Sequence, residues 1–72
     1  MNIKELKETK VFAGVSEGGK VSKLYNLEGG GVLAFFEFPH GVVQVIKFFE
    51  VAGSVRYSIE QELCVKDAVL AV

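Results

Sequence analysis

Two glycine-rich stretches hold the residues best suited to contacting a small ligand. The residues concerned are Gly18, Gly19, Lys20, Gly29, Gly30 and Gly31. Backbone N–H groups in such loops can surround an anion, and a lysine can add charge. A phosphate-binding P-loop, however, requires GxxxxGK[ST] between a strand and a helix. Here Val21 and a strand-like pattern follow Lys20. Both stretches are therefore interpreted first as turns, with a small anionic or nucleotide ligand as the alternative.

The other reactive side chains lack partners at catalytic spacing. His40 follows a proline in a turn-like sequence, and Cys64 has no histidine close to it in the chain. Glu60 and Glu62 alternate with apolar residues, a pattern typical of a solvated strand face. With one histidine and one cysteine, a structural zinc site is improbable. We therefore expect no catalytic residues, no metal and no cofactor, and predict that the protein is not an enzyme.

Length and composition favour a single small domain that associates with itself. The 72 residues are 50% hydrophobic and include six phenylalanines. A domain of this size buries only about 60% of its unfolded surface, so it usually needs a disulfide, a metal or a partner. The single cysteine excludes an internal disulfide. A homo-oligomer, dimeric or larger, is the remaining solution.

Charge and hydropathy limit the other partners. The formal net charge of −1 argues against nucleic acid and against a membrane surface. The charged N-terminal segment does not have the apolar stretch of a signal peptide. No apolar run approaches the roughly 18 residues of a membrane span. A cytoplasmic location is the expectation.

The strongest structural signal is the apolar run at residues 41–51. It is rich in β-branched and aromatic residues and is bracketed by turn signals, Pro39 to Gly41 before it and Ala52 with Gly53 after it. Both faces of such a strand carry apolar side chains, which is typical of a strand with neighbours on both sides. We therefore expect a central strand here.

The turns on either side predict the register. A three-residue turn with Gly41 in the left-handed region pairs residues 32–38 with residues 42–48, and a two-residue turn pairs the central strand with residues 54–63. In the second hairpin the predicted partners are Phe48 with Tyr57, Ile46 with Ile59, Gln44 with Gln61, and Val42 with Leu63. One face then collects the predicted core: Val32, Ala34, Phe36, Phe38, Val42, Ile46, Phe48, Val55, Tyr57, Ile59 and Leu63.

The rest of the chain completes a mainly β fold (α+β by a small margin) in one domain spanning residues 1–72. We expect a short N-terminal helix at residues 2–9, with Asn2 as its cap, and antiparallel strands within residues 10–66. Residues 10–15 and 20–27 supply two of these strands. The prediction is a five-stranded antiparallel meander, curled into a strongly bent sheet or small barrel. Residues 68–72 form an apolar ending that packs or pairs, although residues 58–72 also fit a helical pattern.

The second sheet face predicts the function. It mixes apolar and charged side chains, and one short helix cannot cover it. The candidate partner or oligomer surface is Phe35, Val45, Lys47, Phe49, Arg56 and Glu60. This pattern favours a non-catalytic binding protein, adaptor-like or inhibitor-like, that acts as a homo-oligomer by occupying a partner surface. The alternatives are a ligand-sequestering oligomer of the kind viruses use against a signalling nucleotide, and a nucleic-acid-binding small barrel.

Overall fold

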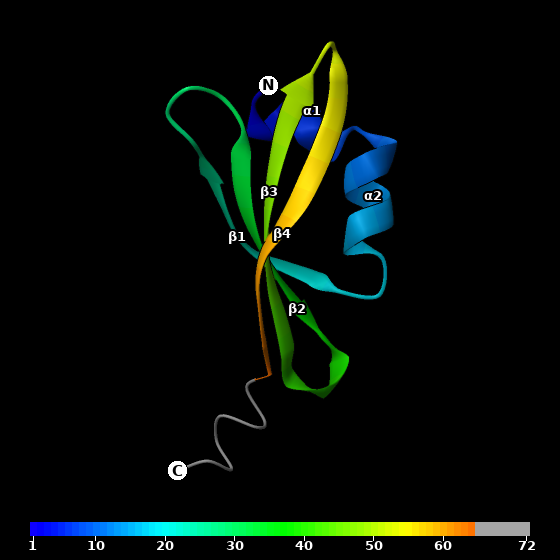
Figure 1. Ribbon diagram of the computed structural model, residues 1–72. Coiled ribbons are helices and arrows are strands. Elements are labelled where there is room, and N and C mark those ends of the chain that lie inside the picture. Colours follow the sequence, from blue (N-terminus) through cyan, green and yellow to red (C-terminus); the bar gives the residue numbers. More distant parts are fainter. Residues whose placement is uncertain (65–72) are drawn as a thin grey trace.

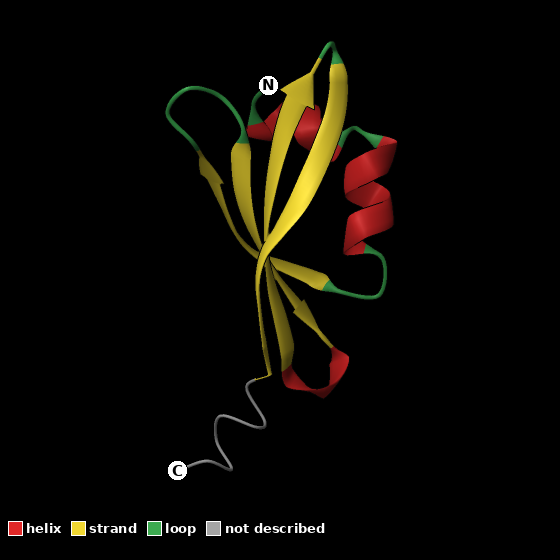
Figure 2. Ribbon diagram, viewed as in Figure 1, coloured by secondary structure: helices red, strands yellow, loops and turns green. Residues whose placement is uncertain are grey.

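A computed structural model describes residues 1–64 as two short helices followed by an antiparallel sheet (Figures 1 and 2). The helices are α1 (Ile3–Lys7) and α2 (Lys10–Ser16). The strands are β1 (Lys20–Asn26), β2 (Val32–Phe38), β3 (Val42–Val51) and β4 (Ser54–Cys64), with a 3₁₀ turn η1 (Pro39–Gly41) between β2 and β3. The strand order β1-β2-β3-β4 is a simple meander, and β3 is central as predicted.

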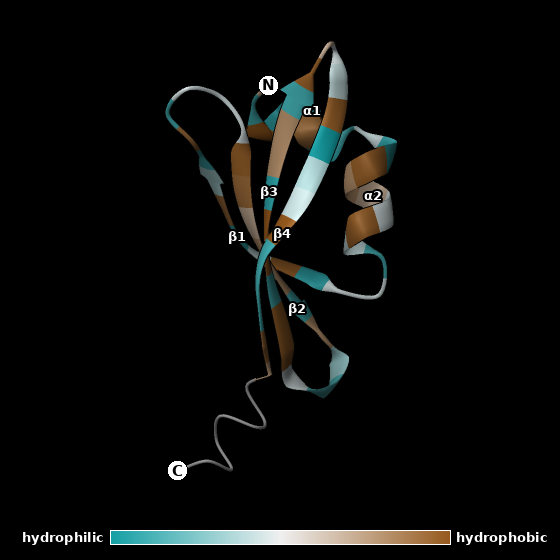
Figure 3. Ribbon diagram, in the orientation of Figure 1, coloured by the Kyte–Doolittle hydropathy of each residue, from teal (hydrophilic) through white to brown (hydrophobic). Residues whose placement is uncertain are grey.

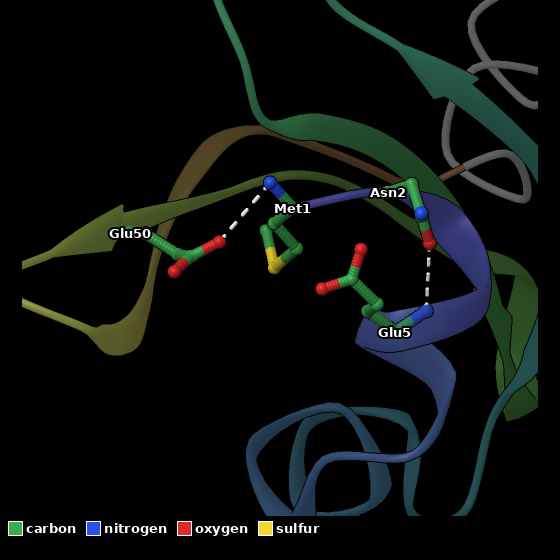
Figure 4. A network of polar contacts seen from close by, with 4 residues as sticks. All are labelled: Met1, Asn2, Glu5 and Glu50. Carbon is green, nitrogen blue, oxygen red and sulfur yellow. Dashed lines mark hydrogen bonds and ion pairs between the residues drawn. The ribbon is translucent and has the colours of Figure 1, made fainter.

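The predicted N-terminal helix is confirmed, although it is shorter than expected. The side chain of Asn2 caps α1, its Oδ1 accepting a hydrogen bond from the backbone N–H of Glu5 at 2.9 Å (Figure 4). The Met1 α-ammonium lies 3.1 Å from Oε1 of Glu50, which joins the start of the chain to β3. The cap satisfies one of the unpaired N–H groups of the first turn. Leu6 then anchors this short helix, because its side chain is fully buried.

The predicted strand at residues 10–15 is wrong, because this segment is the helix α2. Thr9 caps it by accepting a hydrogen bond from the N–H of Phe12 at 3.2 Å, while its own hydroxyl donates to the carbonyl of Leu6 at 2.7 Å. In a helix, residues 11, 12 and 15 share one face. Phe12 is buried there and Val11 and Val15 pack beside it. Tertiary contact on this face outweighs the strand preference of the two valines.

The register of the central hairpins is largely confirmed. Every predicted pair between β2 and β3 is present, from Phe38 with Val42 to Val32 with Phe48. Gly41 adopts the expected left-handed conformation, at φ 77°. Between β3 and β4, the two-residue turn is formed by Ala52 and Gly53, both at positive φ. The residues of the two turns therefore determine how β2 pairs with β3 and how β3 begins to pair with β4.

Beyond Ile59 the predicted pairing of β4 is wrong by one residue. Ile46 pairs with Ile59 as expected, but Val45 pairs with Gln61, so Glu60 is an extra residue in a β-bulge. Consequently Gln44 faces Glu62, where Gln61 was predicted, and Val42 faces Cys64, where Leu63 was predicted. A bulge moves every later side chain to the other face of its strand. Leu63 thus lies on the face opposite the helices.

The core lies between the helices and one sheet face. Leu6 and Phe12 from the helices pack on the fully buried residues of β2 and β3, which are Val32, Ala34, Phe36, Ile46 and Phe48. The ring of Phe12 lies 5.7 Å from those of Phe36 and Phe48, centroid to centroid. Three predicted core residues are wrong: Tyr57, Ile59 and Leu63 are exposed. The helices cover β2 and β3, and β4 extends beyond that cover.

The sheet has four strands, where five were predicted, and it is not closed into a barrel. Within residues 1–64 the outer strands β1 and β4 pair only with β2 and β3 respectively. Figure 1 shows the strands strongly twisted, with both helices on one side of them. The architecture is therefore mainly antiparallel β with short N-terminal helices. The end of the predicted strand region at residue 66 and the predicted apolar ending at residues 68–72 lie outside the described residues.

Candidate binding surface

The sheet face without helices, called here the mixed face, carries an apolar strip across all four strands. Its members follow from the strand pairing and from the alternation of side chains along each strand. They are Tyr25, Leu33, Phe35, Val43, Val45, Phe49 and Leu63. Tyr25 reaches this face because a bulge in β1, between Val21 and Lys23, changes the alternation. Figure 3 shows hydrophobic residues running along β2 and β3.

Side chains of the strip partly shield one another from solvent. Val45 is only 8% exposed, and Phe35, directly opposite it on β2, is partly buried. Tyr25 packs edge-on against Phe35, with ring centroids 6.0 Å apart. Phe49 is also partly buried. The three predicted contact residues Phe35, Val45 and Phe49 therefore lie together on one face, but with less exposed surface than the sequence suggested.

The three charged residues of the candidate surface lie on β3 and β4. Lys47 on β3 pairs with Leu33 of β2 on one side and with Ser58 of β4 on the other. Arg56 lies opposite Phe49. Glu60 occupies the bulge, where its carboxylate accepts a hydrogen bond from the Ser58 hydroxyl at 3.1 Å. The structure thus brings the predicted surface residues onto one contiguous region.

The most exposed large apolar side chains of residues 1–64 are Tyr25 on β1 and Val51, Tyr57, Ile59 and Leu63 on the β3–β4 hairpin. Tyr25, Val51 and Leu63 lie on the mixed face, whereas Tyr57 and Ile59 lie on the helix side of the sheet. Tyr57 is 49% exposed and Ile59 is 52% exposed, although both point to the helix side of the sheet. Sequence reasoning assigned them to the core. Their position on the last strand of a meander was the available signal, because such a strand lies at the sheet edge.

The two glycine loops do not come together. Gly18, Gly19 and Lys20 connect α2 to β1, whereas residues 29–31 connect β1 to β2. At about 3.3 Å per residue, the seven residues of β1 separate the loops by roughly 20 Å. Figure 1 shows them at opposite ends of β1. They cannot contact one small anion jointly.

Backbone geometry explains the glycines in each loop. A Cβ at Gly19 would lie 2.5 Å from the Phe38 ring, and one at Gly31 would lie 2.8 Å from the carbonyl oxygen of Phe48. Gly31 also has φ 102°, which side-chain-bearing residues rarely adopt. Gly29, Gly30 and Gly31 line a hollow together with Phe49 and Glu50. Met1 lines the same hollow, and its ammonium lies 3.1 Å from the Glu50 carboxylate, so the two charges there are paired.

The remaining reactive side chains are spread over separate elements. His40 is exposed in the η1 turn, as predicted, and Cys64 is a partly exposed free thiol at the end of β4. Glu62 hydrogen-bonds with the Gln44 amide across the strands. Among residues 1–64, no three His, Cys, Asp or Glu side chains are grouped as metal ligands. None of the helices described is long and apolar enough to cross a membrane.

The chain was also compared with known proteins. No protein-family model, curated protein or solved structure matches it.

Proposed function

We propose that this protein is a non-catalytic binding protein that acts as a homo-oligomer, in an adaptor-like or inhibitor-like role. The observation that carries the proposal is that exposed apolar side chains gather on the β3–β4 hairpin, where Val51 and Leu63 lie on the mixed face and Tyr57 and Ile59 lie on the helix side. Large apolar groups gathered on a small protein's surface mark interaction sites. Both surfaces belong to the same antiparallel sheet.

The chemistry of the surface suits a protein partner. Aromatic residues are enriched at protein interfaces, and Phe35 and Phe49 supply two on the mixed face, with Tyr57 on the helix side of the same sheet. Arg56 and Glu60 lie on the edge strand β4, at the margin where charges cost least, whereas Lys47 lies on the central strand β3. Such a contact must bury on the order of 1,000 Å² or more to persist at micromolar concentration.

The two other hypotheses have less support. A nucleic-acid-binding small barrel requires a closed or nearly closed sheet, whereas β1 and β4 of this sheet are separate edges. An anion-binding role that joins the two glycine loops is opposed by their separation, because about 20 Å of β1 lies between them. A binding surface on the sheet is the better-supported function.

Sedimentation equilibrium of the purified protein at micromolar concentration tests the proposal. We expect a mass of at least a dimer. A monomeric mass throughout would contradict the homo-oligomer. The variant Phe49→Glu, measured beside Ala13→Glu on the exposed side of α2 as a control of equal charge change, tests the mixed face. Dissociation in Phe49→Glu alone would assign the contact between copies to that face. Retained association would leave that face free for another protein.

A further inference from the structure

Within residues 1–64, no strand pairs with the outer edge of β4, which is 11 residues long. Its inner edge pairs with β3. Among the residues that the structure describes, no backbone hydrogen bond from a turn or loop reaches its outer edge. An open edge of this length is a template for another strand, and natural proteins usually protect it with charges, bulges or a covering element. Here the bulge at Glu60 limits the accessible segment to the part of β4 before it.

The turn fixes which backbone groups point outward. A two-residue hairpin turn closes on a hydrogen-bonded pair, which here is Val51 with Ser54. Hydrogen-bonded and non-hydrogen-bonded pairs alternate along an antiparallel ladder. The N–H and C=O groups of Arg56 and Ser58 therefore point toward β3. Those of Tyr57 and Ile59 point out of the open edge.

The segment around Ser58 is complementary to a second, antiparallel copy of itself. Arg56 lies two residues before Ser58, and Glu60 lies two residues after it. The hydrogen bond from the Ser58 hydroxyl to the Glu60 carboxylate places Glu60 on the face of Ser58, which is also the face of Arg56. Tyr57 and Ile59, one residue on either side, share the opposite face. A two-fold axis through Ser58 would therefore place opposite charges together and apolar groups together.

We propose that two copies of this chain pair antiparallel through β4, with Ser58 of each copy at the two-fold axis. The proposal rests on the homo-oligomer proposed above and assigns its contact to the sheet edge. Tyr57 pairs with the partner's Ile59 and exchanges backbone hydrogen bonds with it, because both residues present their backbone groups outward. Arg56 lies opposite the partner's Glu60. The two sheets become one continuous sheet, and the apolar strip of the mixed face remains free in both copies.

The neighbouring hollow supports this register. Between α2 and β4 lies an open space of about 380 Å³, lined by Val11, Val55 and Tyr57 among others. The partner's Ile59, beside Tyr57 on the helix side of the sheet, lies at its mouth and covers apolar surface that one copy leaves exposed. If the two-fold axis passed through Tyr57, Arg56 would lie opposite the partner's Ser58. If it passed through Ile59, Glu60 would lie opposite the partner's Ser58. Only the axis through Ser58 matches both charges.

A charge exchange tests the register. In Arg56→Glu or Glu60→Arg, like charges meet at two symmetric places, so the dissociation constant of the dimer should rise about tenfold in sedimentation equilibrium. The double variant Arg56→Glu/Glu60→Arg restores opposite charges and should return the constant to the wild-type value. Lys23→Glu, an exposed reversal of equal charge change on β1, is the control and should leave it unchanged. Far-UV circular dichroism confirms that each variant remains folded.

Amide hydrogen exchange gives a second measurement that needs no mutation. The amides of Tyr57 and Ile59 should become protected as protein concentration rises, whereas the Ser58 amide, bonded to β3, should not change. If the wild type is a dimer but its dissociation constant is unchanged in the single variants, or stays raised in the double variant, the proposed register is wrong. The homo-oligomer itself would still stand. A wild-type monomer, with Tyr57 and Ile59 amides unprotected at all concentrations, would overturn both.

Discussion

Truncation of Phe12 should remove a large part of the stability of this protein. Phe12 is 8% exposed, and the centroid of its ring lies 5.7 Å from the ring centroids of Phe36 and of Phe48. Phe12→Ala loses the transfer energy of the ring and leaves a cavity under α2, a change that costs about 3–5 kcal/mol. At roughly 0.05–0.15 kcal/mol per residue, a 72-residue domain holds only about 4–11 kcal/mol in total. We therefore expect Phe12→Ala to lose between about a quarter and all of the stability of the domain.

Urea unfolding followed by far-UV circular dichroism measures the effect. Phe12→Leu keeps most of the apolar volume and should lose less than about 1.5 kcal/mol, which keeps the series measurable. Tyr25→Ala is the matched aromatic control, because Tyr25 is 47% exposed and packs on Phe35 alone among the rings of the described residues. It should cost about 1 kcal/mol. Equal losses in Phe12→Ala and Tyr25→Ala would refute the conclusion that α2 closes the core.

Two further predictions concern glycines. Gly14→Ala should raise the free energy of unfolding by about 0.5–1 kcal/mol, because Gly14 lies inside α2 and a Cβ there meets nothing within 4 Å. A lower melting temperature in thermal unfolding would argue against the helix. Gly31→Ala should cost at least about 1 kcal/mol more than Gly30→Ala, because both have positive φ but only Gly31 would place its Cβ against a backbone oxygen. Equal loss in urea unfolding would contradict that close contact.

The sequence alone determined the central part of the sheet. Residues 32–51 are rich in β-branched and aromatic residues, lack glycine apart from Gly41, and are joined and followed by turns whose chemistry admits few geometries. The register of β2 on β3, the positive φ of Gly41 and the turn at Ala52 and Gly53 followed from these local rules. Asn2 as a helix cap also followed, because capping depends only on residues within one turn. These features are local, so tertiary contacts did not override them.

The candidate surface was predictable only in part. The residues of the mixed face followed from strand alternation, and Phe35, Val45 and Phe49 do share that face. The exposure of Tyr57 and Ile59 did not follow, because alternation shows which face a side chain occupies and not whether anything covers it. That depends on how far the helices reach across the sheet.

Tertiary structure decided the remaining features. Residues 10–16 have valines that favour a strand, yet they form α2, because Thr9 caps the helix and Phe12 fills the space above Phe36 and Phe48. The bulge at Glu60 changed the face of Leu63, and no turn residue marks it in the sequence. Intrinsic preferences of about 1 kcal/mol or less per residue are small beside the several kcal/mol gained by burying an aromatic ring. Packing therefore determined that residues 10–16 form a helix and how the edge strand β4 is arranged, whereas local turn geometry determined the central hairpins.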